Sequence, residues 1–436
     1  MNEFDVTQFE AAFERRVRRY AAVPTRRFDA AAIAHDAVRP RRRLALPSLT
    51  RPALAPAYVL LLITLAGALL VGAAFAAGLL RPPQQPRPLG ANGAIAFQVD
   101  PFDRSMAGDV HEVSADGSGD RLIATGRAPS FSADGVTLSY EAFDNTDPSL
   151  AEPHLVVAAA DGGNPRTVSR AQVYEFKVAP DAHWAVGRET ADGALTLLDL
   201  TSGAARTLLG APSDPAVAYD DEVAWSPDSR FVAVGVLAEV HDGANIAQYQ
   251  AAIDVVDVST GVVHTVTERP GNPAGLGWSP DGSSLVYLGL PDGQPATEFA
   301  VAPPDLDIFT IRADGTDEHN VTNAPSSYSS PLWSPDGSRI AFRSSVAEDY
   351  LLGVIGATGG GVVYGPSVGL VSGDFIWSPD ATMLLLVRNA HTYDVAAGDV
   401  YTGTLDTVDS SFRTAPTTLA TFDRPLAFPS WQRLER

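Results

Sequence analysis

Short apolar segments recur along most of the chain, and turns rich in Asp, Gly, Pro and Ser separate them. Residues 285–290 (LVYLGL), 339–344 (RIAFRS) and 383–388 (MLLLVR) have the length and apolar content of buried strands. Each follows a Ser-Pro-Asp-type turn, in which Pro fixes φ and Asp binds nearby backbone groups. The pattern therefore predicts an all-β architecture over most of the chain.

A turn phrase, Trp-Ser-Pro-Asp, recurs about every 50 residues, with a weaker copy at Phe131 (FSADG) and a truncated one that ends at Trp431 (PSW). Its aromatic members are Phe131, Trp225, Trp278, Trp333, Trp377 and Trp431, and Val178 takes this position in a weaker copy. Each copy begins a unit of four short antiparallel strands, with the aromatic residue near the end of the first strand. Such units repeated at this period are typical of a β-propeller, so we interpret the aromatic positions as packing between blades.

The two ends of the repeat region predict how the ring closes. The region starts in the middle of a unit, with strands within 94–99, 109–117 and 120–124, and it finishes with a first strand alone, over 426–434. The C-terminal strand should complete the blade that begins at residue 93, which gives seven blades. Six blades is the alternative if the copy at Val178 is not a full unit, but an outer hairpin over 196–209 favours seven.

The phrase WSPDG followed by a strand, with an outer hairpin that closes on an ADG or SG turn, resembles the WD40-like repeat of TolB-type bacterial propellers. It is also similar to the N-terminal propellers of prolyl-oligopeptidase-type enzymes. The resemblance covers about residues 93–436 and implies a fold, whereas it leaves the activity open. A soluble TolB has a separate N-terminal α/β domain and lacks an anchored leader, so a Tol-system role is not expected.

One uncharged apolar segment precedes the repeats. Residues 57–80 would form a helix of about 36 Å, enough to cross the ~30 Å core of a bilayer. A cleaved signal peptide is the alternative, because Ala74-Phe75-Ala76 resembles a cleavage site. The apolar run is longer than a signal h-region and 56 residues precede it, so we expect an uncleaved transmembrane helix over 56–80.

Arginines on the two sides of this segment predict its orientation. Five lie shortly before it, at Arg39, Arg41, Arg42, Arg43 and Arg51, whereas only Arg81 and Arg87 follow shortly after. The positive-inside rule places the N-terminus in the cytoplasm and the repeat region outside, in the periplasm or the extracellular space. The expected domains are a basic helical segment (1–55), the transmembrane helix (56–80), a Pro-rich linker (81–92) and the propeller (93–436).

Residues 1–55 carry 11 Arg and 6 acidic residues, and Phe9, Phe13, Val17 and Tyr20 have helical spacing. A helical cytoplasmic tail, one membrane span and an outer domain resemble the layout of single-pass anti-sigma factors. That layout implies a cytoplasmic sigma factor as a candidate partner. The zinc-type anti-sigma motif is absent because the chain has no Cys. A simple anchor extension is the alternative.

Composition excludes several functions. A net charge of −21 disfavours nucleic-acid binding, and the absence of Cys excludes disulfides, Cys-ligated zinc and iron–sulfur clusters. Gly365-Pro366-Ser367-Val368-Gly369 matches G-x-S-x-G, but it lies between repeat strands rather than in an α/β-hydrolase elbow. The eight His form no local metal or triad motif. We therefore expect no enzyme, and a hydrolase or lyase in the propeller channel is the alternative.

Loop lengths indicate which face of the propeller binds. The connections between second and third strands are long, at 100–109, 143–153, 239–247, 291–305 and 389–399, and segment 212–222 should join them. This face gathers the candidate binding residues Asp103, Asp144, Asp147, Asp220, Asp221, Asp242, Asp305 and Asp394. An acidic face favours a cation, with calcium as the candidate and no other cofactor expected, or a basic partner. Solubility alone is the alternative role. We expect a binding module for an envelope protein or a glycan, with sensing as a further role.

Overall fold

The computed structural model describes residues 88–100, 108–143, 153–168, 173–189, 191–214, 217–241, 247–270, 274–291, 306–323, 327–346, 349–367, 374–394 and 398–435. The chain divides into two compact units, residues 1–84 and 85–436, and every described residue belongs to the second unit. The predicted cytoplasmic segment and transmembrane helix lie outside the described residues. Within the described ranges, no helix has the length and hydropathy that a membrane crossing requires.

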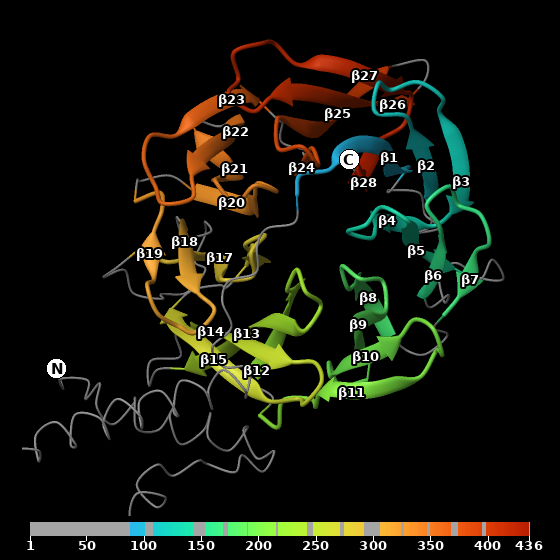
Figure 1. The fold of residues 1–436 in the computed structure, drawn as a ribbon. Helices are drawn as coiled ribbons and strands as arrows, with labels where there is room; N and C mark the ends of the chain where they lie inside the picture. The colour runs from blue at the N-terminus through green and yellow to red at the C-terminus, as the bar shows by residue number, and fades with distance from the viewer. Residues whose placement is uncertain are drawn as a thin grey trace, which may run out of the picture. The chain divides into compact units, whose positions relative to one another are not determined.

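Twenty-eight strands in these ranges form seven four-stranded antiparallel sheets, arranged as the blades of a ring (Figure 1). Blade 1 contains β28 (Leu426–Leu434), β1 (Ala91–Val99), β2 (Asp109–Val113) and β3 (Arg121–Thr125). Blade 2 contains β4 (Arg127–Phe131), β5 (Thr137–Phe143), β6 (Pro153–Ala159) and β7 (Arg166–Thr167). Blade 3 contains β8 (Val173–Val178), β9 (Trp184–Glu189), β10 (Leu195–Asp199) and β11 (Ala205–Leu209).

The remaining blades repeat this order. Blade 4 contains β12 (Val217–Trp225), β13 (Phe231–His241), β14 (Ala247–Asp257) and β15 (Val263–Pro270). Blade 5 contains β16 (Gly277–Trp278), β17 (Ser284–Gly289), β18 (Asp307–Arg312) and β19 (His319–Asn320). Blade 6 contains β20 (Ser327–Trp333), β21 (Arg339–Val346), β22 (Asp349–Gly356) and β23 (Val363–Ser367). Blade 7 contains β24 (Phe375–Trp377), β25 (Met383–Asp394), β26 (Gly398–Asp409) and β27 (Thr417–Phe422).

The ring closes through the C-terminal strand. Strand β28 pairs antiparallel with β1, with Trp431 opposite Ile95 and Leu434 opposite Ala91. The predicted closure is confirmed, and so is the count of seven blades. The six-bladed alternative is wrong, because β8 to β11 form a complete sheet around the weak copy at Val178.

The apolar cores lie between neighbouring blades, because both faces of each sheet are covered. Ile95, Phe97 and Val99 of β1 pack on one side against blade 7, whereas Ala96 packs on the other side against blade 2. Each fully buried large side chain stabilises the fold by roughly 1.5–3 kcal/mol. Burial on both faces explains why these strands appear in the sequence as continuous apolar runs rather than as alternating ones.

Three predicted loops are shorter than expected. Strands β13 and β14 remain paired as far as His241 and Ala247, and β25 and β26 as far as Asp394 and Gly398. The connections are therefore 242–246 and 395–397, not 239–247 and 389–399. Strand β12 likewise occupies most of 212–222. Polar residues near these tips look like loop in the sequence, but backbone pairing continues because a ladder does not require apolar side chains.

Candidate functional site

The repeated Ser-Pro-Asp turn is held by the same hydrogen bonds in five blades. In blade 5, Ser279 Oγ donates to Asp281 Oδ1 at 2.6 Å and accepts from the Ser284 backbone N at 3.0 Å. The same pair of bonds is made by Ser132, Ser226, Ser334 and Ser378. Partial burial raises the pKa of Asp281, but hydrogen bonds from Ser279 and Ser283 outweigh it and hold the pKa below its usual value. The turn aspartates therefore have a structural role as acceptors of these bonds.

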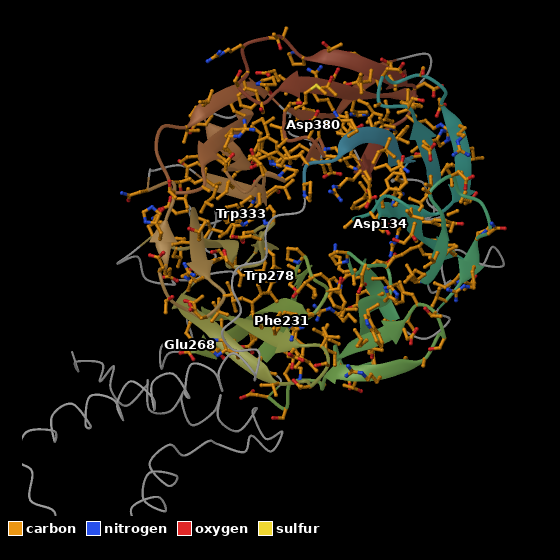
Figure 2. All side chains as sticks on the ribbon, viewed as in Figure 1. Asp134, Phe231, Glu268, Trp278, Trp333 and Asp380 are labelled. Atoms are coloured by element: carbon orange, nitrogen blue, oxygen red, sulfur yellow. The ribbon has the colours of Figure 1, made fainter. Side chains whose placement is uncertain are left out.

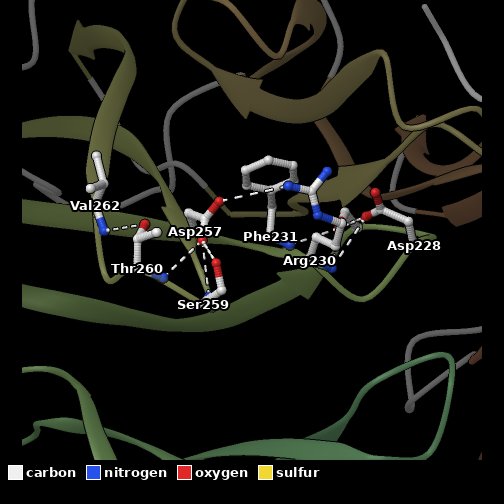
Figure 3. Close-up of polar contacts among 8 residues, drawn as sticks. Asp228, Arg230, Phe231, Asp257, Ser259, Thr260 and Val262 are labelled. Carbon is white, nitrogen blue, oxygen red and sulfur yellow. Dashed lines mark hydrogen bonds and ion pairs between the residues drawn. The ribbon is translucent and has the colours of Figure 1, made fainter. Parts of the chain in front are cut away.

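Blades 2 to 7 each carry two short turns, after the first and third strands, and in blade 4 these turns are joined (Figure 3). Asp257 Oδ1 accepts hydrogen bonds from the backbone N of Ser259 and of Thr260, both at 2.9 Å, within the third turn of the blade. Arg230, in the first turn, forms an ion pair with Asp257 at 4.0 Å. The first and third turns of this blade therefore lie at the same face. We call it the short-turn face, and the opposite face, with the second connections, the loop face.

The aromatic residue of the turn phrase ties one blade to the next. The indole Nε1 of Trp225 donates to the Lys177 carbonyl at 2.8 Å. The indole Nε1 of Trp278 donates to the Ala224 carbonyl at 3.1 Å. Trp377 makes the corresponding bond to Leu332, and the buried Trp431 bonds to Gly93 in its own blade, both at 3.1 Å. The indole N of Trp333 is different, because it is buried and has no hydrogen-bond partner among the described residues.

Five blades carry another repeated feature in or just before their first strand, for which the sequence gives no prediction. Three residues before the turn aromatic or its equivalent, φ is positive at Ala128 (49°), Glu175 (56°), Ser330 (53°) and Phe428 (48°), and at Gly275. The ladder shifts register beside this point in β4, β8 and β20. These strands lie nearest the centre of the ring, as β4 and β8 show in Figure 1. Mostly non-glycine residues occupy the position, so the sequence carries no obvious signal for it.

Phe428 is the bulky member of this set. Its side chain is 50% exposed, and its backbone N donates to Asp374 Oδ2 at 2.9 Å. Burial raises the pKa of Asp374, and the hydrogen bond from Phe428 and the Arg343 charge only partly oppose this effect. Positive φ is strained for a large aromatic side chain, so Asp374 holds Phe428 in a conformation that the isolated residue avoids.

The predicted acidic binding set is not assembled by the described side chains. Asp103, Asp144, Asp147, Asp242 and Asp305 lie outside the described residues. Asp220 and Asp221 belong to β12, and Asp394 ends β25, but their side chains are also outside the description. The binding role of this set therefore stays a prediction. Among the described residues, no group of three His, Asp or Glu side chains is placed to hold a metal ion.

The G-x-S-x-G match does not form a nucleophile elbow in the described structure. Ser367 ends β23, where it lies opposite Leu351 of β22 in a blade. A nucleophile elbow places its serine between a strand and a helix of an α/β sheet. The strand that carries Ser367 belongs instead to a four-stranded antiparallel sheet.

A cavity of 470 Å³ opens at the short-turn face between blades 5 and 6. Blade 5 contributes Asp281, Ser284 and Asp317, and blade 6 contributes Trp333, Asp336 and Ala357. The volume is in the range of small-molecule and peptide side-chain pockets, about 300–1,000 Å³. We call this cavity the blade 5–6 groove. It lies on the face opposite the one that loop length alone favours.

The closed ring of four-stranded blades and the repeated turn phrase define a seven-bladed β-propeller. Oligogalacturonate lyase from Vibrio parahaemolyticus is similar in structure, with 10% identity, a TM-score of 0.51, and coverage of 75% of this chain and 86% of the lyase. The propeller domain of the Trilobed protease from Pyrococcus furiosus has 10% identity and a TM-score of 0.51, covering 77% and 97%. That domain has an open velcro topology, whereas β28 closes the ring here.

TolB from Acinetobacter baumannii also matches, with 17% identity and a TM-score of 0.43. The match covers 78% of this chain and 66% of the TolB chain, so this chain spans slightly less than two thirds of that protein. No protein-family model matches the sequence, and no curated protein matches it. At these identities the likenesses show the fold alone.

Proposed function

We propose that this chain is a membrane-anchored binding module, in which residues 57–80 span the membrane and the propeller lies outside the cytoplasm. The observation that carries the proposal is the division of the ring into two faces. The short-turn face is fixed by the same turn bonds in five blades, whereas the second connections, such as 100–108 and 290–306, differ widely in length. A rigid ring with variable connections on one face is the usual arrangement of a binding scaffold.

The charge of the chain supports the membrane arrangement. The propeller side carries 46 acidic and 20 basic residues, whereas residues 1–55 are basic. A basic segment that precedes a membrane-spanning segment tends to stay in the cytoplasm itself. An acidic propeller favours a basic protein or a cation such as calcium as the ligand on the loop face. The proposed role is binding without catalysis.

The membrane arrangement can be tested by cysteine labelling, because the chain contains no Cys. Ala22→Cys reports on the N-terminal segment, and Val262→Cys reports on an exposed turn of the propeller. A membrane-impermeant maleimide should label only Val262→Cys when it is applied to intact cells. After permeabilisation it should label both variants. If Val262→Cys is labelled only after permeabilisation, the propeller is cytoplasmic and the arrangement is wrong.

Binding on the loop face can be tested by pull-down with the full chain in detergent against envelope extract, with and without calcium. The double variant Asp220→Asn, Asp221→Asn neutralises part of the predicted acidic set. Asp116→Asn is the control, because Asp116 lies in a short turn of blade 1. A partner lost only in the double variant supports the proposal. If the unaltered chain, the double variant and Asp116→Asn all capture the partner equally, the loop-face acids do not take part in binding.

A signalling role is a second candidate, favoured by the helical spacing of Phe9, Phe13 and Val17 in the basic tail. In this role the tail would bind a sigma factor, as the layout of anti-sigma factors implies. Full-length chain isolated from its own cells should then carry a sigma factor, and a variant lacking residues 1–55 should not. A preparation free of sigma factor would leave the tail as an anchor extension.

A further inference from the structure

At the other seams that place a Trp between blades, a large side chain stands at the position that lines the blade 5–6 groove. Six residues after the turn aromatic, or its equivalent, the first residue of the second strand reaches toward the next blade. Phe231 stacks on Trp278 with ring centroids 6.4 Å apart (Figure 2), and Met383 packs in the same cluster as Trp431. Trp184 packs in the same cluster as Trp225. The corresponding residue before Trp333 is Ser284, which is too small to cover the indole.

The neighbouring seam shows which chemical group fits this place. Between blades 6 and 7, the guanidinium of Arg339 lies 4.9 Å from the centre of the Trp377 ring. It donates to the Ala381 carbonyl at 2.7 Å and to Ser410 Oγ at 2.8 Å. A guanidinium over an indole is a favourable cation–π contact. Arg339 therefore closes its seam with an aromatic contact and two hydrogen bonds.

The blade 5–6 groove has the same backbone positions without the arginine, and Ala357 has no hydroxyl to accept a hydrogen bond as Ser410 does. Gly337 follows Trp333 by four residues, as Ala381 follows Trp377. Ala357 corresponds to Ser410, because each donates its backbone N to the residue five positions after the Trp of its blade, at 3.0 Å. Gly337, Ala357 and Trp333 all line the groove. The cavity is thus the place of the missing guanidinium.

The charge of the groove also favours a cation. Asp281 and Asp317 come from blade 5 and Asp336 from blade 6, whereas Arg312 is the one arginine among the lining residues. Arg312 acts on the nearby Asp314, whose pKa is lowered first by Thr316 and also by the Arg312 charge. Partial burial raises the pKa of Asp336, but bonds from Ser334 and Ser338 outweigh it and keep the carboxyl ionised at neutral pH. The groove therefore has an excess of negative charge beside an aromatic ring.

We propose that the blade 5–6 groove binds the guanidinium of an arginine side chain from a basic peptide, in the place that Arg339 occupies at the next seam. The ligand bridges the two blades, because its binding groups come from both. This site lies on the short-turn face and does not depend on the loop-face binding or on the membrane arrangement proposed above.

The test uses the full chain in detergent and the capped tripeptide Ac-Gly-Arg-Gly-NH₂, with Ac-Gly-Gln-Gly-NH₂ as the neutral control. The arginine peptide should bind at least about tenfold more tightly by calorimetry, as a cation–π contact and an ion pair together imply. Its affinity should fall with added salt, because the charges are near the surface. Equal binding of both peptides, or no binding of either, would overturn the proposal.

Ser284→Arg is the decisive variant, because it supplies the missing guanidinium from the chain itself. It should raise the melting temperature and weaken binding of the arginine peptide by about tenfold or more. Val136→Arg is the matched control, because it adds an arginine at an exposed turn position of blade 2. If Ser284→Arg binds the peptide as the unaltered chain does, the groove is not the site.

Asp317→Asn provides a second measurement if Ser284→Arg does not fold. Asp317 is exposed and has a φ of 57°, a conformation that Asn accepts well. The variant should fold normally and lower the affinity for the arginine peptide about threefold to tenfold. Asp423→Asn, at a fully exposed carboxylate outside the groove, should leave the affinity unchanged. Equal affinity in the two variants would contradict the proposal.

Discussion

The aspartate of the repeated turn holds the turn through a local set of hydrogen bonds. Asp281 accepts from Ser279, from Ser283 and from the Ser283 backbone N, at 2.6, 2.8 and 3.0 Å. These bonds favour the ionised form and lower the pKa against the opposing effect of partial burial. A lowered pKa in the folded state stabilises the fold above the ordinary pKa of the group and ceases to do so as pH falls through the folded-state value.

Asp281→Asn should therefore lose about 1 kcal/mol of unfolding free energy at pH 7, because it weakens bonds to a partly exposed charged acceptor. The difference from the unaltered chain should shrink as pH falls below the ordinary value of 3.8. Urea unfolding of both proteins at pH 7 and at about pH 3 measures this change. A difference that stays constant with pH would mean that the charge of Asp281 does not contribute.

Phe428 is a bulky residue in a conformation that suits small or polar ones. Phe428→Asn loses a half-exposed ring but relieves the positive φ of 48°, so the unfolding free energy should change by less than about 1 kcal/mol. Phe97→Ala removes a fully buried ring and should cost about 3–5 kcal/mol. Urea unfolding compares the two. A loss of several kcal/mol in Phe428→Asn would show that its ring packs as a core residue.

At the scale of the strand and the blade, the seams are the units that hold the ring together. Each sheet has too little area to bury its apolar side chains alone, so it packs both faces against its neighbours. The indole bonds add a polar link across three seams, between Trp225 and Lys177, between Trp278 and Ala224, and between Trp377 and Leu332. The seam at Trp333 lacks this link among the described residues.

Trp225→Phe and Trp333→Phe should therefore differ in effect. Trp225→Phe removes a hydrogen bond to the Lys177 carbonyl and should cost about 1 kcal/mol more than Trp333→Phe, whose indole N has no bond to lose. Both variants keep an aromatic ring in the seam, so they lose similar packing. Chemical denaturation of the two proteins in parallel measures the difference. Equal losses would show that the indole bonds add nothing to the seams.

At the scale of the whole molecule, stability depends on closing the ring. Removing residues 426–436 deletes β28 and leaves β1 as an exposed edge with Trp431 gone from its cluster. We expect loss of cooperative thermal unfolding and increased aggregation, measured by circular dichroism and size-exclusion chromatography. Removing residues 435–436 alone should have little effect, because β28 ends at Leu434. A monomeric, cooperative protein after the larger deletion would show that closure by β28 is not required for stability.

Much of this ring is predictable from the sequence, because the turn phrase marks the end of one strand in nearly every blade. The spacing from Trp225 to Trp278 and Trp333 sets the period, and the lone strand over 426–434 indicates the closure. The hairpin tips at His241 and Asp394 are not predictable in the same way. Their pairing depends on backbone bonds, which polar side chains do not reveal.

The candidate sites are less predictable than the fold. The groove exists because the small Ser284 stands where Phe231 and Arg339 stand in other blades. A serine in a turn gives no sign of a cavity until the neighbouring indole is placed beside it. The strained position of Phe428 is equally hidden, because no glycine marks it. The loop-face acids are predicted by loop length alone, and their role awaits the pull-down.

The position of β1 has a mechanical consequence. Strand β1 is paired along one edge with β28 and along the other with β2, and its first residue, Ala91, lies opposite Leu434. A pulling force applied to the chain before Ala91 acts on a strand held by two ladders, so both must yield before the strand leaves the sheet. Resistance to such a force is governed by the unfolding rate rather than by equilibrium stability. A tether at this end of β1 therefore loads a strand that is paired along both of its edges.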